Sequence, residues 1–205
     1  MKLKQIESIL KSRKTIFIMQ SSGGQWLSDG SAMYPVYNLP RLTQDNIYAL
    51  FDIVGEQQDK YLVEIRELPG FINFTDSDVT GRMLDRASMY LTVDGQMLEP
   101  LETSQGLVFI QRKYLKPFTD LADGVELYER TDLNGNIYIA VKSGFLLMGV
   151  IMPYRTINAK FIRTLDRWAK LSNVALLNMA HTKTELIAPE QQELDGVSED
   201  DDDDD

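Results

Sequence analysis

The apolar residues of this chain follow helical spacing in some segments and strand-like composition in others. At the N-terminus, Leu3, Ile6, Ile9 and Leu10 fall on one helix face, so residues 2–12 are predicted to form an amphipathic helix. Runs rich in β-branched and aromatic residues are predicted as strands. The predicted strands are 14–20, 25–27, 32–36, 60–68, 88–93, 107–111, 126–131, 137–141 and 146–152. Further helices are predicted over 44–54, 112–118 and 157–171. The pattern predicts an α+β fold of antiparallel sheets with short amphipathic helices on one face.

Two stretches of the chain share one order of elements. Each begins with a helix and continues through a strand, a glycine turn, a second strand and an apolar run that ends before a proline. The turn glycines, Gly24 and Gly135, lie 111 residues apart. This order predicts an internal duplication, although sequence identity between the stretches is slight. We therefore expect two α+β modules, 1–100 and 101–188, and an acidic tail over 189–205.

The net charge of the chain, −10, resides entirely in its last sixteen residues. Residues 190–205 hold ten acidic side chains and no basic one, so residues 1–189 carry 21 of each sign. Six consecutive aspartates repel one another and offer nothing to bury, which is typical of a disordered segment. The tail is either a solubilising end or an electrostatic mimic of a phosphate backbone that competes for a basic surface.

The inventory of side chains argues against most enzymatic chemistry. The chain has no cysteine and a single histidine, His181, which excludes thiolate metal sites and two-histidine zinc motifs. No phosphate-binding glycine loop is present. Asp132, Asn134 and Gly135 fit a hairpin turn better than a calcium loop. We expect a non-enzyme with no cofactor and no metal site. The apolar runs are too short to span a bilayer and the N-terminus lacks a signal-peptide pattern, so a cytoplasmic location is expected.

The cations gather on predicted helices. Twelve of the 21 lie on or beside the helices predicted at 2–12, 112–118 and 157–171. Such rows are either solvated helix faces or a basic surface that contacts the backbone of a polyanion. If these rows contact the backbone of a polyanion, DNA is the expected partner. The predicted DNA-binding residues are Lys4, Lys11, Arg112, Lys113, Lys116, Lys160, Arg163, Arg167 and Lys170.

Residues 107–155 resemble the last domain of bacterial DNA sliding clamps. In that family a strand runs into a short helix with a Tyr-Leu pair, and Val108 to Leu115 (VFIQRKYL) shows this pattern. The final strand of the family ends in a Val-Val-Met-Pro-Met-Arg run, which corresponds here to Val150 to Arg155 (VIMPYR). The likeness covers about 50 residues well and the rest of the chain in element order.

The resemblance implies a ring of repeated α/β modules, with helices lining a hole that passes DNA and sheets on the outside. It also implies an apolar pocket that holds peptides of replication proteins. Carried over to this sequence, the pocket residues are Val150, Met152, Pro153, Tyr154 and Arg155. Clamp rings line their hole with twelve helices, so four predicted helices per chain imply a homotrimer.

The leading interpretation is a sliding-clamp-like processivity factor or replication accessory protein that tethers enzymes to DNA without catalysis. The alternatives are a single-stranded-DNA-binding protein, an acidic-tailed interaction protein with no nucleic-acid role and, more remotely, a hydrolase.

Overall fold

The computed structural model describes residues 2–77, 81–121 and 124–185, and side chains up to residue 179. The chain divides into two compact units, Met1–Arg155 and Thr156–Asp205. The boundary that we expected near residue 100 therefore falls inside the first unit. The predicted acidic tail lies outside the described residues.

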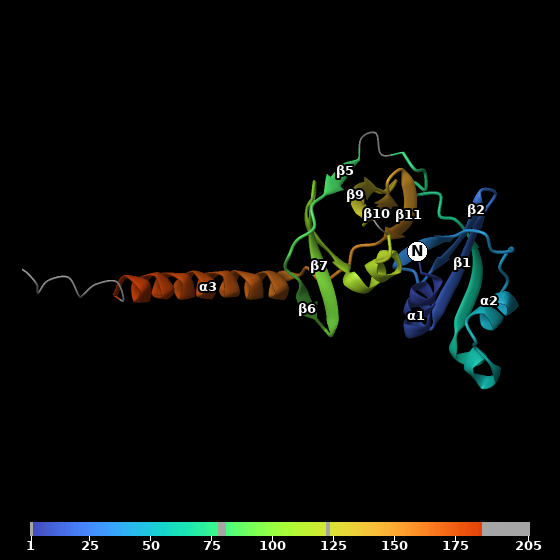
Figure 1. Cartoon of the computed structure of the whole chain (residues 1–205), viewed down its shortest axis with the longest axis horizontal. Coiled ribbons are helices and arrows are strands. Elements are labelled where there is room, and N and C mark those ends of the chain that lie inside the picture. The colour runs from blue at the N-terminus through green and yellow to red at the C-terminus, as the bar shows by residue number, and fades with distance from the viewer. Residues whose placement is uncertain (1, 78–80, 122–123, 186–205) are drawn as a thin grey trace, which may run out of the picture. The chain divides into compact units, whose positions relative to one another are not determined.

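The first unit is built on one eight-stranded sheet and one three-stranded sheet (Figure 1). In spatial order, the larger sheet consists of β4 (Leu62–Glu67), β1 (Thr15–Ser21), β2 (Gly24–Ser28), β3 (Ala32–Val36), β11 (Leu146–Ile151), β10 (Ile137–Ser143), β9 (Glu126–Thr131) and β5 (Arg82–Leu84). The smaller sheet consists of β6 (Leu91–Val93), β7 (Gln96–Thr103) and β8 (Gly106–Gln111). All described strand pairs are antiparallel except β1 with β4. The predicted α+β class is confirmed.

The two stretches of similar element order meet at the centre of the large sheet. Strand β3 pairs with β11, with Met33 opposite Val150 and Ala32 opposite Ile151. The strands β1-β2-β3 on one side of this seam are matched by β9-β10-β11 on the other. A helix precedes each triplet: α1 (Leu3–Arg13) before β1, and the 3-10 helix η2 (Arg112–Phe118) before β9. The predicted modules 1–100 and 101–188 thus both contribute strands to the large sheet.

The helices of the first unit begin and end where local chemistry requires. Helix α1 buries Ile6, Ile9 and Leu10 and ends at Lys14, whose φ of 53° is left-handed. Helix α2 (Gln44–Leu50) begins as predicted, because the Thr43 hydroxyl accepts the N–H of Asn46 at 3.2 Å. It ends earlier than the predicted residue 54.

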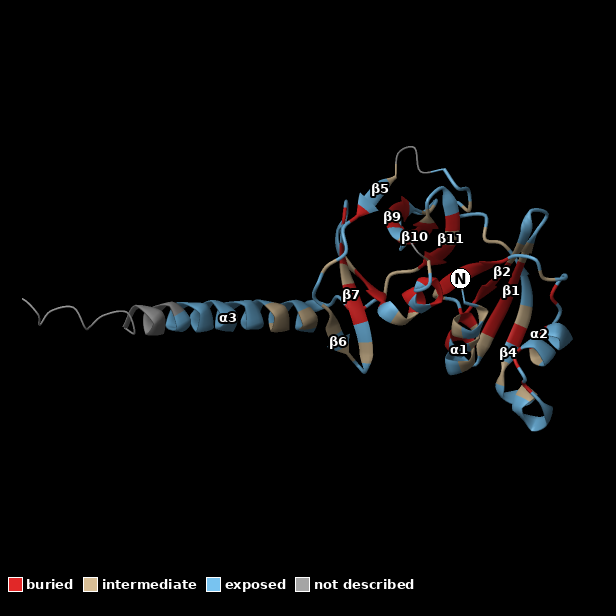
Figure 2. Ribbon diagram, in the orientation of Figure 1, coloured by how far each residue is buried: buried red, intermediate tan, exposed pale blue. Residues whose placement is uncertain are grey.

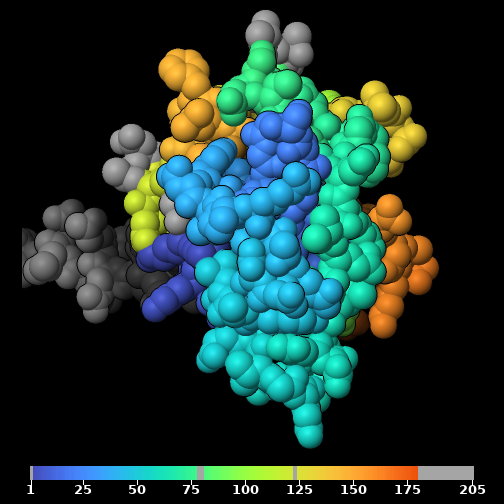
Figure 3. Space-filling model, turned by 90° about the vertical axis from the view of Figure 1, so that its right-hand side faces the viewer, coloured from blue at the N-terminus to red at the C-terminus, as the bar shows by residue number. Residues whose placement is uncertain are grey.

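The segment that follows α2 forms a second 3-10 helix, η1 (Gly55–Lys60), ahead of strand β4. Helix α2 packs near β4. In Figure 3 the cyan residues around α2 lie in the middle of the surface facing the viewer, and the blue-green residues that follow α2 lie below them.

Both faces of the large sheet are buried at its centre (Figure 2). Since neighbouring strand residues point to opposite faces, Ile16 and Ile18 pack with α1 while Phe17 and Met19 belong to a second cluster. That second cluster includes Ile72 from the loop after β4, and half-buried Phe74 packs against it. Helices therefore cover one face, as predicted, and an irregular loop covers part of the other.

The second unit contains α3 (Ala159–Glu185). Its first turn is capped by Asn158, whose Oδ1 accepts the N–H groups of Lys160 and Phe161 at 3.0 Å. The helix is longer than the predicted 157–171, because no glycine or proline interrupts residues 172–185. Trp168 and Leu177 are more than half exposed. No described helix is long and apolar enough to cross a membrane.

Candidate nucleic-acid interface

Helices α1 and η2 lie in contact and bring together cations that are about a hundred residues apart in sequence. The backbone N–H of Lys2 donates to the carbonyl of Pro117 at 2.8 Å and ties the start of α1 to η2. The resulting group, called here the helix layer, contains Lys2, Lys4, Lys11, Arg13, Lys14, Arg112, Lys113 and Lys116.

Some cations of the helix layer have acidic partners and others have none. Lys11 pairs with Glu7 at 2.7 Å, and Lys2 pairs with Asp120. Within the part of the chain that the structure describes, Lys4, Lys14 and Lys116 form no ion pair, and all three are exposed. Unpaired, exposed cations in one layer suit contacts with phosphate groups, which bind cations without reading base identity.

A buried carboxylate joins the two halves of the sheet to this layer. Asp29 is 3% exposed, and its Oδ1 accepts the backbone N–H groups of Ser31 and Ala32 at 2.9 and 3.0 Å. Its Oδ2 accepts the Tyr114 hydroxyl at 2.8 Å. The Tyr34 hydroxyl in turn donates to the Tyr114 carbonyl at 3.0 Å. This network fixes the 3-10 helix η2 on the turn between β2 and β3, so it positions the cations of η2.

Burial changes the acidity of three side chains in this network. It raises the pKa of Tyr114 and of Tyr34, and the negative charge of Asp29 adds to both shifts. Burial lowers the pKa of Lys113, an effect that Asp29 opposes and Arg13 reinforces. The tyrosines therefore remain neutral hydrogen-bond donors at neutral pH. No sequence pattern pointed to a role for Asp29, because a carboxylate next to a turn glycine is ordinarily solvated.

The other predicted DNA-binding residues lie on α3 in the second unit. Lys160, Arg163, Arg167 and Lys170 are exposed and recur every three or four residues, so they share one helix face. Lys170 pairs with Asp166 one turn earlier, with an Nζ–Oδ2 distance of 2.7 Å. These residues form a basic row of their own.

The residues of the predicted peptide pocket differ in their burial. Val150 is fully buried in the sheet, whereas Met152, Pro153 and Tyr154 are half-buried and Arg155 is exposed. The Tyr154 N–H donates to the Phe109 carbonyl, so the segment after β11 runs beside β8. Both cavities described below are lined by other residues.

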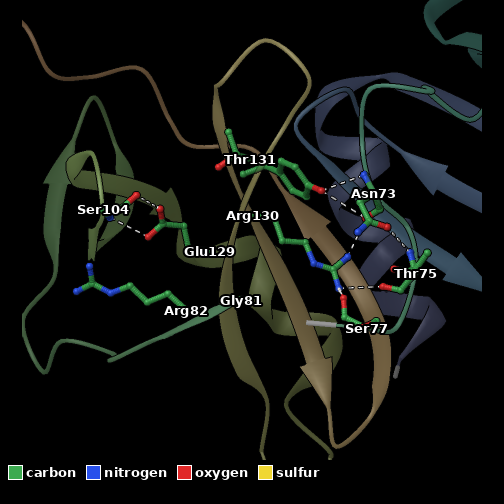
Figure 4. A pocket seen from close by; sticks show the side chains of 10 residues that line it. Asn73, Thr75, Ser77, Gly81, Arg82, Ser104, Glu129, Arg130 and Thr131 are labelled. Atoms are coloured by element: carbon green, nitrogen blue, oxygen red, sulfur yellow. Dashed lines mark hydrogen bonds between the residues drawn. The ribbon is translucent and has the colours of Figure 1, made fainter. Parts of the chain in front are cut away.

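One polar cavity of about 620 Å³ lies against β9 (Figure 4). Arg130 is buried and donates to the carbonyls of Asn73 and Thr75, both at 2.8 Å. On the neighbouring position, Glu129 accepts the N–H and the hydroxyl of Ser104. These polar groups satisfy one another, so Arg130 anchors the loop after β4, and Glu129 anchors the β7–β8 turn.

A second cavity, of about 710 Å³, lies between β7 and η2. Its cations include Arg112, Lys113 and Lys116, all three predicted as DNA-binding residues. Residues of the helix layer thus also line a concave site, which the sequence did not predict.

Comparisons with protein-family models, with curated proteins and with solved structures found no match for this chain. Among residues 2–77, 81–121 and 124–185, no cluster of three or more acidic, histidine or cysteine side chains could hold a metal ion.

Proposed function

We propose that this protein is a non-catalytic, sliding-clamp-like processivity factor that binds DNA and tethers replication enzymes to it. The observation that carries the proposal is the helix layer: α1 and η2 hold equivalent places in two similar halves and lie in contact. Together they carry eight of the chain's 21 cations. A basic helical layer backed by a continuous sheet is the arrangement that the clamp resemblance implies.

The same observation changes the expected assembly. The predicted homotrimer assumed four equivalent helices per chain, but α2 packs near β4 and α3 belongs to the second unit. Within the first unit, α1 and η2 are the basic helices that lie in contact with each other. A ring lined by twelve helices then needs six chains of 23.4 kDa each. Light scattering that gives a monomer at tens of micromolar contradicts a closed ring.

The DNA-binding part of the proposal is tested with two charge-matched variants. In the layer variant, Lys4, Lys14, Lys113 and Lys116 become Gln; in the α3 variant, four cations of α3 change in the same way. The α3 substitutions are Lys160→Gln, Arg163→Gln, Arg167→Gln and Lys170→Gln. Affinity for labelled duplex and single-stranded DNA is measured by fluorescence anisotropy from about 50 to 200 mM salt.

We expect the layer variant to lose affinity and its salt slope to fall by roughly one unit per phosphate contact removed. Circular dichroism checks that the fold is retained. An unchanged layer variant refutes the proposed interface, and a loss confined to the α3 variant moves DNA binding to the second unit. Preference for the single-stranded probe over the duplex favours the single-stranded-DNA-binding alternative.

A further inference from the structure

The cavity between β7 and η2 combines positive charge with apolar walls. Its volume of about 710 Å³ lies within the range of about 300–1,000 Å³ that is usual for ligand sites. Met97, Leu115 and Phe118 supply apolar surface, and the described lining contains four cations and no carboxylate. A ligand that fits both properties is negatively charged and carries an apolar side chain.

Among the described residues, one of the four cations, Arg86, has an acidic partner. Arg86 forms two hydrogen bonds with buried Glu99, at 2.6 and 3.0 Å. Arg112 lies 4.2 Å above the ring of Tyr90, measured from its guanidinium carbon to the ring centroid. Within the described part of the chain, Arg112, Lys113 and Lys116 form no ion pair. Three positive charges therefore line this cavity with no acidic partner among the residues that the structure describes.

Gln111 adds a polar group that has no partner. Its side chain is 6% exposed, lines the cavity, and holds an Oε1 atom without a hydrogen bond. A buried acceptor of this kind destabilises a fold unless a donor reaches it. Phosphate groups of nucleic acids offer only acceptors, whereas a peptide backbone offers N–H donors. The unpartnered oxygen therefore favours an occupant that offers an N–H donor, which a peptide backbone supplies and a phosphate group does not.

The chain itself contains a peptide of this chemistry. Residues 190–205 hold ten acidic side chains and no basic one, and Leu194 and Val197 lie among them. We propose that the cavity between β7 and η2 is a binding site for acidic peptides and that its occupant is the chain's own segment 190–205. The acidic side chains pair with Arg112, Lys113 and Lys116, the apolar ones pack on Leu115 and Met97, and the buried Gln111 amide turns towards the cavity to accept a backbone N–H.

The test measures binding of a fluorescein-labelled peptide with the sequence of residues 190–205 by anisotropy. Two full-length proteins are compared: the natural chain, and a variant whose ten acidic tail residues are replaced by Asn or Gln. We expect the neutral-tail variant to bind the peptide and the natural chain to bind it at least about ten-fold more weakly, because a linked segment competes at a high effective concentration. Absence of binding to the neutral-tail variant overturns the proposal.

Specificity is tested in the neutral-tail background with paired substitutions of equal charge. Changing Lys113 and Lys116 to Gln should weaken peptide binding roughly ten-fold, as expected for two partly exposed ion pairs. The matched change of Lys4 and Lys14 to Gln, on or next to α1, should alter it less than about two-fold. Equal losses in both variants overturn the proposed site, since they indicate general attraction between opposite charges.

Two further changes separate this site from a nucleic-acid groove. A peptide in which Ser replaces Leu194 and Val197 should bind more weakly at unchanged charge. Gln111→Leu should weaken peptide binding while raising the melting temperature of the protein, because it removes a buried acceptor without a partner. An unchanged affinity in both experiments, with competition by a single-stranded oligonucleotide, overturns the peptide proposal in favour of nucleic acid.

Discussion

Replacement of Asp29 by Ala should destabilise the first unit more than any single change in its surface charge. The substitution removes the acceptor for the N–H groups of Ser31 and Ala32 and for the hydroxyl of Tyr114. Ala32 and Tyr114 are each 1% exposed, so water cannot replace the lost bonds. Each buried donor left unpaired costs roughly 1–3 kcal/mol. We expect a total loss of about 3–5 kcal/mol, a large part of the roughly 5–15 kcal/mol that stabilises an ordinary domain.

The conservative change Asp29→Asn keeps the shape of the side chain and removes its charge, so it separates the effects of the two on stability. An asparagine keeps an oxygen for the two backbone N–H groups but offers no carboxylate to Tyr114. The expected loss is about 1 kcal/mol, the difference between a charged and a neutral acceptor. Tyr114→Phe alone should lose a similar amount, and the double variant should show that the two effects are coupled.

Urea denaturation followed by circular dichroism gives these free energies. Asp132 supplies the control, because its Oδ1 also accepts two backbone N–H groups beside a turn, those of Asn134 and Asn136, but at an exposed site. Asp132→Ala should therefore cost much less than Asp29→Ala. Equal losses for the two alanine variants refute the reasoning that burial makes Asp29 important.

Three further predictions concern packing, pH and the tail. Gly149→Ala should destabilise the protein by about 1–3 kcal/mol in urea denaturation, since the new Cβ would lie 2.8 Å from Phe118 Cζ, whereas Gly70→Ala meets open space and should be neutral. The pKa of Tyr114 is raised above its ordinary value of 10.0, so the stability that its neutral hydroxyl contributes is complete below pH 10 and is lost as the pH rises further. The urea concentration at the unfolding midpoint should therefore fall between about pH 8 and 11, and it should fall less steeply in Tyr114→Phe. Truncation after Pro189 should raise non-specific DNA affinity at about 50 mM salt more than at 200 mM, and identical binding curves for the two proteins would show that the tail does not screen a DNA site.

The spacing of apolar residues predicted the helices and strands of this fold better than it predicted which strands pair. Helix α1 and the meander β9-β10-β11 follow the apolar pattern closely. The two-residue turn Asp94-Gly95, which joins β6 to β7, has both residues in the left-handed region, as a tight hairpin requires. Pairing of β3 with β11 depends on side-chain packing between segments more than a hundred residues apart. The local spacing of apolar residues carries no information on that contact, so the sequence predicted two modules but not that they share the large sheet.

For a similar reason, only part of the candidate site could be predicted from the sequence. The cations of α1 and η2 were found because helical spacing and charge are local properties. The roles of Asp29 and Gln111 depend on burial, which follows from the tertiary structure. Val150 is a residue that the motif match marked as part of a pocket. Its position in strand β11 buries it fully in the core.

The seam between β3 and β11 has a consequence for synthesis of the protein on the ribosome. The partner edge of β3 is supplied only when residues 150 and 151 have emerged, more than a hundred residues after Met33. At usual translation rates this interval lasts roughly ten seconds. During that time β3 presents unpaired backbone groups and the apolar side chain of Met33, which makes it a template for pairing with other nascent chains. Aggregation during expression should therefore depend on the speed of translation between β3 and β11, and slower codons in this interval should increase it.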